Sequence, residues 1–401
     1  VVLFNLWFVP ITPIKIVGLL MVVGAMFAAA PAAAAKRLSS AIPILYIAFA
    51  ALPIALTLLF GITFPRASAS ALVSYGLLLI ATRRLVSTPE RLANVVRVLV
   101  FAETFGSLWL YKQQYILHML NPNGPSGDSN YEALSIVMTI PLAIYLIRND
   151  HSVMWRRIAL VCTPILGFAL LVSQSRGGVL ALAVLIVLAW LRSSRKLMFV
   201  IVGAMLLGAA AAMAPQVTWE RFQQIQISGR PTTGAELSTR TRIELWRGGL
   251  HIIEKHPIFG IGLNQFKEQV AFYNPRLIAV AGKSFIAHET YIQVWAEEGL
   301  PVLVVFLTMI GRALLNCRYA EREGCGRGGG FGELGIAMQF GLIAYMVAAL
   351  FLSAQLVKTL WMFVFLSQNV REIECATKDA AAPVVEPLRT SAARRRVASY
   401  A

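Results

Sequence analysis

The chain carries little charge for its length. Only 14% of its 401 residues are charged and 57% are hydrophobic, whereas about a quarter of a soluble domain is charged. The hydrophobic residues come in blocks of roughly 15 to 25, the length at which a helix crosses about 30 Å of hydrocarbon. The shortage of charge therefore argues against a soluble fold and predicts an all-α membrane protein.

Acidic residues and cysteines are scarce as well. The chain has 20 acidic residues against 36 basic ones, and its 4 cysteines lack the spacing of a metal site. We therefore expect neither a disulfide nor a zinc site. No Asp-x-Asp pair occurs in the segments assigned below to the outer side of the membrane, so we expect a function without a metal ion or other cofactor.

The hydrophobic blocks predict about twelve membrane spans. They lie near residues 1–13, 14–34, 41–64, 68–81, 95–110, 131–147, 154–173, 177–191, 197–214, 288–315, 334–352 and 355–366. The chain then divides into four parts: N-terminal spans (1–214), a large loop that contains helices (215–287), C-terminal spans (288–370) and a poorly ordered cytoplasmic tail (371–401). No internal repeat is visible.

The orientation of the spans follows from the basic residues, because short loops rich in Lys and Arg stay in the cytoplasm. Such residues recur in alternate loops, for example at Lys36 and Arg37, Arg83 and Arg84, Arg156 and Arg157, Arg192 and Lys196, and Arg318 and Arg322. The large loop should therefore face the periplasm. Most of the formal net charge of +16 lies in these cytoplasmic loops and the tail, so we do not expect nucleic-acid binding.

The large loop contains one strong helix pattern. Thr241 and Glu244 have the spacing of a capping box, and apolar residues follow at helical spacing: Ile243, Trp246, Leu250 and Ile253. We predict a helix over 241–255 that lies along the outer membrane boundary, followed by a turn at Gly260 and Gly262. A second cluster of turn-forming residues, in 111–130, is typical of either a lid or a connector.

Four arginines are candidates for binding an anion. Arg176 lies in a connector so short that its side chain must sit at the membrane boundary, where it either reaches lipid phosphates or clamps an anionic substrate. The others surround the start of the predicted loop helix: Arg240, Arg242 and Arg247. They form either a solvated face or, at Arg242, an anion site at a helix N-terminus.

His288 is the candidate general base. It stands where the chain is expected to re-enter the membrane, and Tyr291, Trp295 and Glu298 follow at spacings that would share its helix face. A histidine there is either a simple interfacial residue or a proton acceptor near neutral pH. Glu298 would anchor a polar network or only support packing.

Three of these segments resemble the O-antigen ligase and polymerase superfamily of membrane glycosyltransferases. They are Ser175–Gly178, Gly260–Phe266 and His288–Leu300. The resemblance implies a GT-C-like fold with catalytic roles for Arg176, Arg242 and His288. From the residues themselves we also expect substrate contacts from these arginines and from Arg240, Arg247, Tyr291 and Glu298. Glu289 departs from the Asn, Ser or Gln that usually follows the histidine in the family.

The ligase branch implies a specific reaction. A glycan would pass from undecaprenyl pyrophosphate to lipid A-core at the periplasmic side of the bacterial inner membrane, with inversion and without a metal. An O-antigen polymerase using the same donor is the nearest alternative. A transporter or flippase of a lipid-linked anion would more often show internal repeats, and a scaffold protein would not need the placement of Arg176 and His288.

Overall fold

A computed structural model of the chain describes residues 4–6, 9–11, 24, 41–59, 66–119, 122–125, 127–194, 196, 208, 234–283, 285–324 and 330–381. Almost all of this part is helical, as expected. The expected spans at 14–34 and 197–214 lie outside the described residues except for single positions. The expected span at 1–13 is wrong: β1 (Phe4–Leu6) pairs antiparallel with β2 (Val9–Ile11). Pro10 and the shortness of the segment disfavour a spanning helix there.

The remaining expected spans coincide with helices. These are α3 (Ala41–Leu59), α4 (Arg66–Leu85), α5 (Pro89–Tyr111), α6 (Ser129–Asn149), α7 (Val153–Val172), α8 (Arg176–Arg192), α14 (Thr290–Gly324), α15 (Phe331–Ala348) and α16 (Lys358–Ala381). A short π-helix, η1 (Lys112–Ile116), extends α5. Among the described residues, 5 helices are long and apolar enough to cross a membrane: α5 with η1, α6, α7, α14 and α15. The chain is thus a multi-pass membrane protein by its helices.

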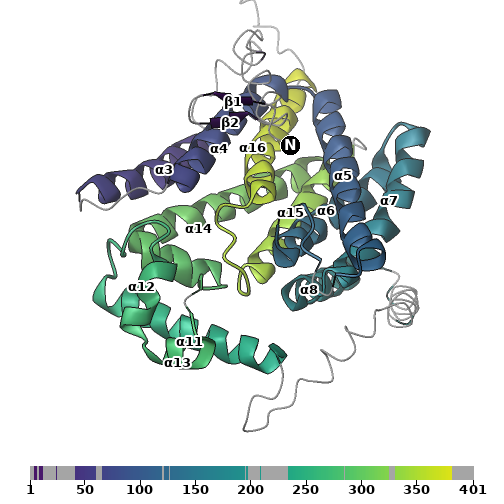
Figure 1. Cartoon of the computed structure of the whole chain (residues 1–401). Helices are drawn as coiled ribbons and strands as arrows, with labels where there is room; N and C mark the ends of the chain where they lie inside the picture. The colour runs from purple at the N-terminus through teal and green to yellow at the C-terminus, as the bar shows by residue number, and fades with distance from the viewer. Residues whose placement is uncertain are drawn as a thin grey trace, which may run out of the picture.

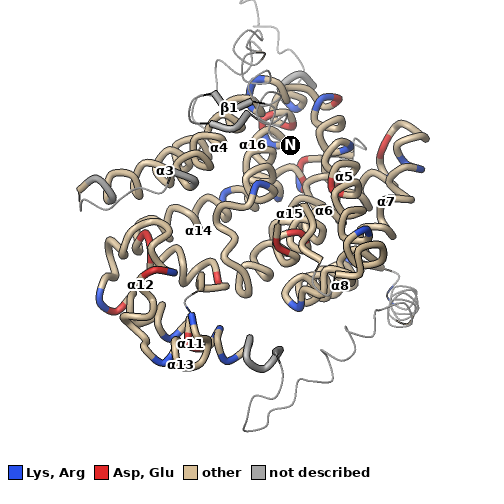
Figure 2. The backbone as a smooth tube through the Cα atoms, viewed as in Figure 1, with Lys and Arg blue, Asp and Glu red and all other residues tan. Residues whose placement is uncertain are grey.

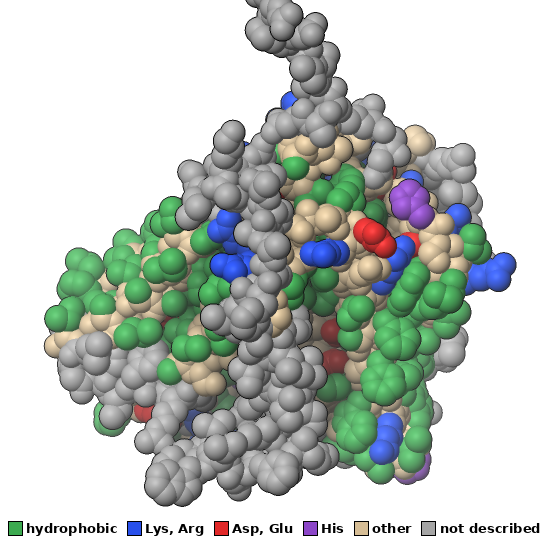
Figure 3. Space-filling model, turned by 90° about the horizontal axis from the view of Figure 1, so that it is seen from above, with side chains coloured by type: hydrophobic (Ala, Val, Ile, Leu, Met, Phe, Trp, Pro, Cys, Tyr) green, Lys and Arg blue, Asp and Glu red, His purple; other side chains and the backbone are tan. Residues whose placement is uncertain are grey.

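The spanning helices differ in how deeply they are buried. The apolar windows of α6 and α15 are 67% and 61% buried inside the protein, whereas those of α5 and α7 are 28% and 33% buried. α6, α14, α15 and α16 therefore form the centre of the helix bundle (Figure 1). Hydrophobic side chains cover both flanks of the molecule when it is seen from above (Figure 3), which suits contact with lipid.

Ion pairs join the helices at one end of the bundle. Arg192 lies 3.2 Å from Glu321, and Lys378 lies 2.7 Å from Glu323. Charged residues gather mainly at helix ends and turns (Figure 2). Because Lys378 and the buried Ile373 hold α16 against α14, this helix continues to Ala381. The tail that we expected to be poorly ordered from residue 371 is therefore helical at its start, and its remainder lies outside the described residues.

Three helices of the large loop form a second, smaller core. They are α11 (Gly234–Lys255), α12 (Phe266–Tyr273) and α13 (Arg276–Ala281), at the lower left of Figure 1. Leu245, Ile252, Phe266 and Val270 pack together between them. We call residues 234–289 the loop unit.

The predicted loop helix has the right end but begins earlier than expected. α11 ends at Lys255 as expected but begins at Gly234, so Thr241 lies inside the helix and does not cap it. The buried face carries Leu245 and Ile252, whereas Ile243 and Leu250 are exposed. Two glycines, 248 and 249, lie on the buried face, and a hydrophobic pattern does not reveal a face on which glycine allows close packing.

α14 is two helices that meet at a sharp break. Gly299 has φ 82° and ψ 172°, which separates a short helix, residues 290–298, from the spanning part that follows. A β-carbon at Gly299 would lie 1.9 Å from the carbonyl oxygen of Ile258, and one at Gly260 would lie 2.4 Å from that of Glu297. The helix expected over 288–315 is therefore divided at Gly299, although α14 as a whole is long and apolar enough to cross a membrane.

The expected turn at Gly260 and Gly262 is present and packs against this break. Ile261 and Gly262 donate backbone hydrogen bonds of 3.0 and 2.7 Å to the carbonyl oxygens of Ala296 and Glu297. Both glycines have positive φ, a conformation that costs a residue with a side chain free energy. We call residues 257–264 the glycine turn; it fastens the loop unit to the helix bundle.

Candidate active site

Side chains from distant parts of the sequence meet beside the start of α8. A pocket of about 250 Å³ is lined by Arg176, Arg242 and Asp128, with one wall formed by the turn after α15 at Phe351 and Leu352. We call this the anion pocket. Among the cavities of the described residues, larger ones lie elsewhere, but this one brings two predicted arginines together. Its size suits a compact charged group more than a whole lipid-linked glycan.

The start of α8 holds Arg176 in place. The hydroxyl of Ser175 accepts a 3.3 Å hydrogen bond from the backbone N–H of Gly178, which caps the helix, and donates one of 2.8 Å to Asn130 Oδ1. A β-carbon at Gly178 would lie 2.8 Å from that of Ala133. Gly178 thus allows the close helix approach expected from the sequence. Arg176 is exposed beside free N–H groups of the helix terminus, which favour an anion.

Arg242 reaches the same pocket from the middle of α11. Our expectation that it lies at a helix N-terminus is wrong, because α11 begins eight positions earlier, at Gly234. Burial lowers the pKa of the half-buried Arg242, and the positive charge of Arg176 lowers it further, while Asp128 acts in the opposite sense. Two like charges are held together here, so a bound anion would relieve their repulsion.

His288 stands next to these charges, just before α14. The φ angle of His288 is 51°. Hydrogen bonds fix the residues around it: Ala287 accepts one of 3.2 Å from the indole N–H of Trp246, and Thr290 N–H donates one of 2.8 Å to the carbonyl oxygen of Ala349. Burial lowers the pKa of His288 to about 4, with Arg242 adding to the shift and Asp128 opposing it. The imidazole is therefore neutral near pH 7. Its buried Nδ1 has no hydrogen-bond partner among the described residues.

Asp128 is the residue that the sequence reading missed. It caps α6 by accepting a 2.7 Å hydrogen bond from Asn130 N–H, and its charge acts on both Arg242 and His288. The segment 111–130, expected to be a lid or a connector, forms a wall of the anion pocket through Asn123 and Asp128. The available signal was an acidic helix cap on the same predicted side of the membrane as Arg176.

The other predicted site residues lie outside the anion pocket. Arg247 pairs with Glu244 at 2.7 Å, and the hydroxyl of Tyr291 donates a 3.0 Å hydrogen bond to Met346. Glu298 lies at the far end of the short helix, and Arg240 does not line the pocket. The shared face expected for His288, Tyr291, Trp295 and Glu298 is also wrong, because His288 precedes the helix.

Glu289 has a local structural task. Its carboxylate accepts a hydrogen bond from Ile292 N–H, and its carbonyl oxygen accepts one of 3.2 Å from Gln293 N–H, so it caps the short helix. Asn, Ser and Gln, which usually follow the histidine in the resembled family, also carry an oxygen that can accept a hydrogen bond. Burial raises the pKa of Glu289 to about 6.

The anion pocket and the nearby His288 together offer two chemical abilities. Guanidinium groups and a helix N-terminus together bind phosphate oxygens, and a neutral imidazole accepts a proton from a hydroxyl. Within the described ranges, no three His, Cys, Asp or Glu side chains come together as a metal site would require.

Comparison with known proteins agrees with this chemistry. No curated protein matches the chain. Residues 161–307, from the middle of α7 to the spanning part of α14, match the family model described as O-antigen ligase. This match includes Arg176, Arg242 and His288 and confirms the resemblance seen in the sequence. Residues 161–307 of the chain are therefore similar to the O-antigen ligase family.

Proposed function

We propose that this protein is an O-antigen ligase of the bacterial inner membrane. It transfers a glycan from undecaprenyl pyrophosphate to lipid A-core at the periplasmic face, with inversion and without a metal ion. The observation that carries the proposal is that Arg176 and Arg242 line one small pocket while the neutral His288 lies close enough to Arg242 and Asp128 to feel their charges. This combination suits a reaction in which a pyrophosphate leaves and a hydroxyl loses its proton.

The two arginines act on the leaving group. They hold the pyrophosphate of the donor, with the N-terminal N–H groups of α8 beside Arg176. As the bond between the anomeric carbon and the phosphate oxygen breaks, that oxygen takes the electron pair and gains negative charge. Fixed donors that face a developing charge stabilise the transition state.

His288 acts on the nucleophile. A hydroxyl of the acceptor attacks the anomeric carbon from the opposite side, which inverts the configuration, and its proton passes to the imidazole. A base with a pKa of about 4 is weak, but a bound pyrophosphate brings negative charge close to Arg242. This charge favours the protonated imidazole and raises the pKa of His288 when the donor is present.

The test is glycan transfer by the purified protein in liposomes, with EDTA present, from undecaprenyl-pyrophosphate-linked O-antigen to lipid A-core. We expect His288→Ala to lower the rate about 10²- to 10⁴-fold. His251→Ala is the matched control, since His251 is exposed and its ring lies 3.2 Å from the carbonyl oxygen of Tyr273. Full activity of His288→Ala would exclude the proposed base.

The products also separate the alternatives. Glycan attached to lipid A-core supports a ligase. Elongated lipid-linked glycan with unmodified lipid A identifies a polymerase. The family match does not distinguish a polymerase from a ligase. The absence of any transfer by a folded protein would reject both enzymes.

A further inference from the structure

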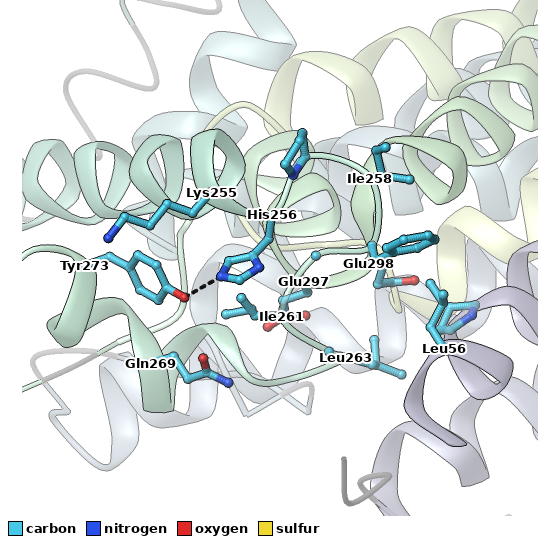
Figure 4. Close-up of a pocket in the computed structure, with 15 residues that line it drawn as sticks. Leu56, Lys255, His256, Ile258, Ile261, Leu263, Gln269, Tyr273, Glu297 and Glu298 are labelled. Atoms are coloured by element: carbon cyan, nitrogen blue, oxygen red, sulfur yellow. Dashed lines mark hydrogen bonds between the residues drawn. The ribbon is translucent and has the colours of Figure 1, made fainter. Parts of the chain in front are cut away.

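A second cavity lies at the other end of the short helix that follows His288. It has a volume of about 550 Å³ and lies between the glycine turn, α12, Glu298 and the part of α3 around Leu56 (Figure 4). None of its lining residues lines the anion pocket. Cavities of this size are typical of sites for small molecules or for single units of longer ligands.

Part of the cavity wall consists of groups that bind hydroxyls, beside apolar residues such as Leu56 and Leu263. Tyr273 and His256 lie on one side, joined by a 2.8 Å hydrogen bond between the phenol and the imidazole. The side chain of Gln269 lies beside them on α12 and offers both a donor and an acceptor. The aromatic ring of Tyr273 adds a flat apolar surface.

Glu298 supplies the most informative group. Its side chain is only 2% exposed, and its Oε1 atom has no hydrogen-bond partner among the described residues. A buried carboxyl oxygen without a partner costs free energy. The cost is explained if a ligand provides the missing donor, because Glu298 lines the cavity.

Glu297, the neighbouring acid, shows what a structural carboxylate does here. It accepts hydrogen bonds of 3.0 Å each from the backbone N–H groups of Asn264 and Phe266, and one of 3.2 Å from Gln293. The fold thus uses Glu297 to hold the glycine turn but does not use Glu298 in this way. The two carboxylates differ in task although they are adjacent.

We infer that this cavity binds a sugar unit of the glycan that the proposed reaction transfers or extends. A sugar hydroxyl can donate to Glu298 and accept from Gln269, and its ring can lie against Tyr273. A hydrocarbon chain would offer no hydrogen bond to the polar groups of Glu298 and Gln269. This inference rests on the proposed function for the source of the glycan.

The spacing between the two sites suits this role. His288 and Glu298 lie ten positions apart, mostly on one helix, which corresponds to about 15 Å at about 1.5 Å per residue. A chain of a few sugar units can bridge such a distance. The cavity would therefore hold the glycan at a fixed offset from the reacting bond, whether it belongs to the donor or to the acceptor.

The experiment measures glycan binding separately from transfer. Lipid-free O-antigen polysaccharide and core oligosaccharide freed of lipid A are each titrated into the purified full-length protein by calorimetry. We expect one of them to bind, and Gln269→Ala to weaken that binding about tenfold. Glu268→Gln, on the exposed side of α12, is the matched control and should bind as the parent does.

A second variant excludes a merely structural explanation. Glu298→Leu removes a buried carboxyl that the fold does not pair, so the melting temperature should stay the same or rise while glycan binding falls. Binding of the polysaccharide would show that the cavity holds the donor glycan, and binding of the core oligosaccharide would show that it holds the acceptor. The inference is overturned if neither probe binds, or if both variants bind with parental affinity.

One further variant keeps the two proposals apart. Arg242→Gln should lose transfer but retain glycan binding, because Arg242 does not line this cavity. If Arg242→Gln and His288→Ala both keep full transfer while Glu298→Leu loses binding, the proposed catalytic roles fail and the glycan cavity stands.

Discussion

The two ends of the short helix at 290–298 are built from different kinds of contact. At the first end, Arg176 and Arg242 line the anion pocket and bring two positive charges close to the neutral His288. At the second end, backbone meets backbone: Gly260 and Gly299 approach carbonyl oxygens more closely than any side chain would permit. One end is therefore defined by charge and the other by shape.

The difference teaches how each end should respond to substitution. A change of charge at the first end leaves the backbone contacts intact and alters chemistry. A change of a single methyl group at the second end forces the glycine turn away from the helix break, and the loop unit with it. Since Arg242 is carried on the loop unit, the second end also determines whether the first end can assemble.

The largest effect is expected from Gly299→Ala. The new β-carbon would lie 1.9 Å from the oxygen of Ile258, and φ is 82°, so we expect a loss of about 3 to 5 kcal/mol or no folded protein. Gly311→Ala is the matched control in the same helix, since a β-carbon there meets nothing within 4 Å. Thermal unfolding in detergent measures both. Equal stability of the two variants would contradict the shape argument.

Much of the helix bundle could be predicted from the sequence, because lipid imposes a long hydrophobic run on each spanning helix. The break at Gly299 was missed, although Glu297 and Glu298 precede it and Pro301 follows it, because the long apolar run after Gly299 outweighed these local signals. The wrong start of α11 has a similar cause. Thr241 and Glu244 have capping-box spacing, but Glu244 instead pairs with Arg247 and with Asn274.

The candidate site was predictable to the extent that it carries unusual side chains at the predicted membrane boundary. Arg176, Arg242 and His288 stand out because a charge or a titratable group is costly there. Asp128 does not stand out, because an aspartate before a helix is a common cap. Its proximity to Arg242 arises from folding between segments more than a hundred positions apart, which local patterns do not encode.

An intermediate effect is expected on the titration of His288 in Arg242→Gln. Burial and the charge of Arg242 lower the pKa of His288 to about 4 from an ordinary 6.5, so removing that charge should raise it back toward 6.5. Carbethoxylation of His288, followed by mass spectrometry across pH 4 to 8, reports the neutral fraction. The midpoint should move upward in Arg242→Gln.

Arg247→Gln is the control for that titration, because Arg247 pairs with Glu244 and is not among the charges that act on His288. Its midpoint should equal the parental one. An unchanged midpoint in Arg242→Gln would show that Arg242 does not act on the imidazole, and the electrostatic contrast between the two ends of the helix would be weakened.

The smallest effect is expected at Glu289, which caps the short helix beside His288. Burial raises its pKa from 4.5 to about 6, so its stabilising contribution is fully present below pH 4.5 and is lost as pH rises through about 6. The difference corresponds to about 2 kcal/mol at most. Glu289→Gln keeps an acceptor for Ile292 N–H without the charge. Its melting temperature should exceed the parental one by a few degrees at pH 8 and match it near pH 4.5, whereas Glu268→Gln should follow the parent at both. A parental pH dependence in Glu289→Gln would mean that the cap does not titrate as a buried acid.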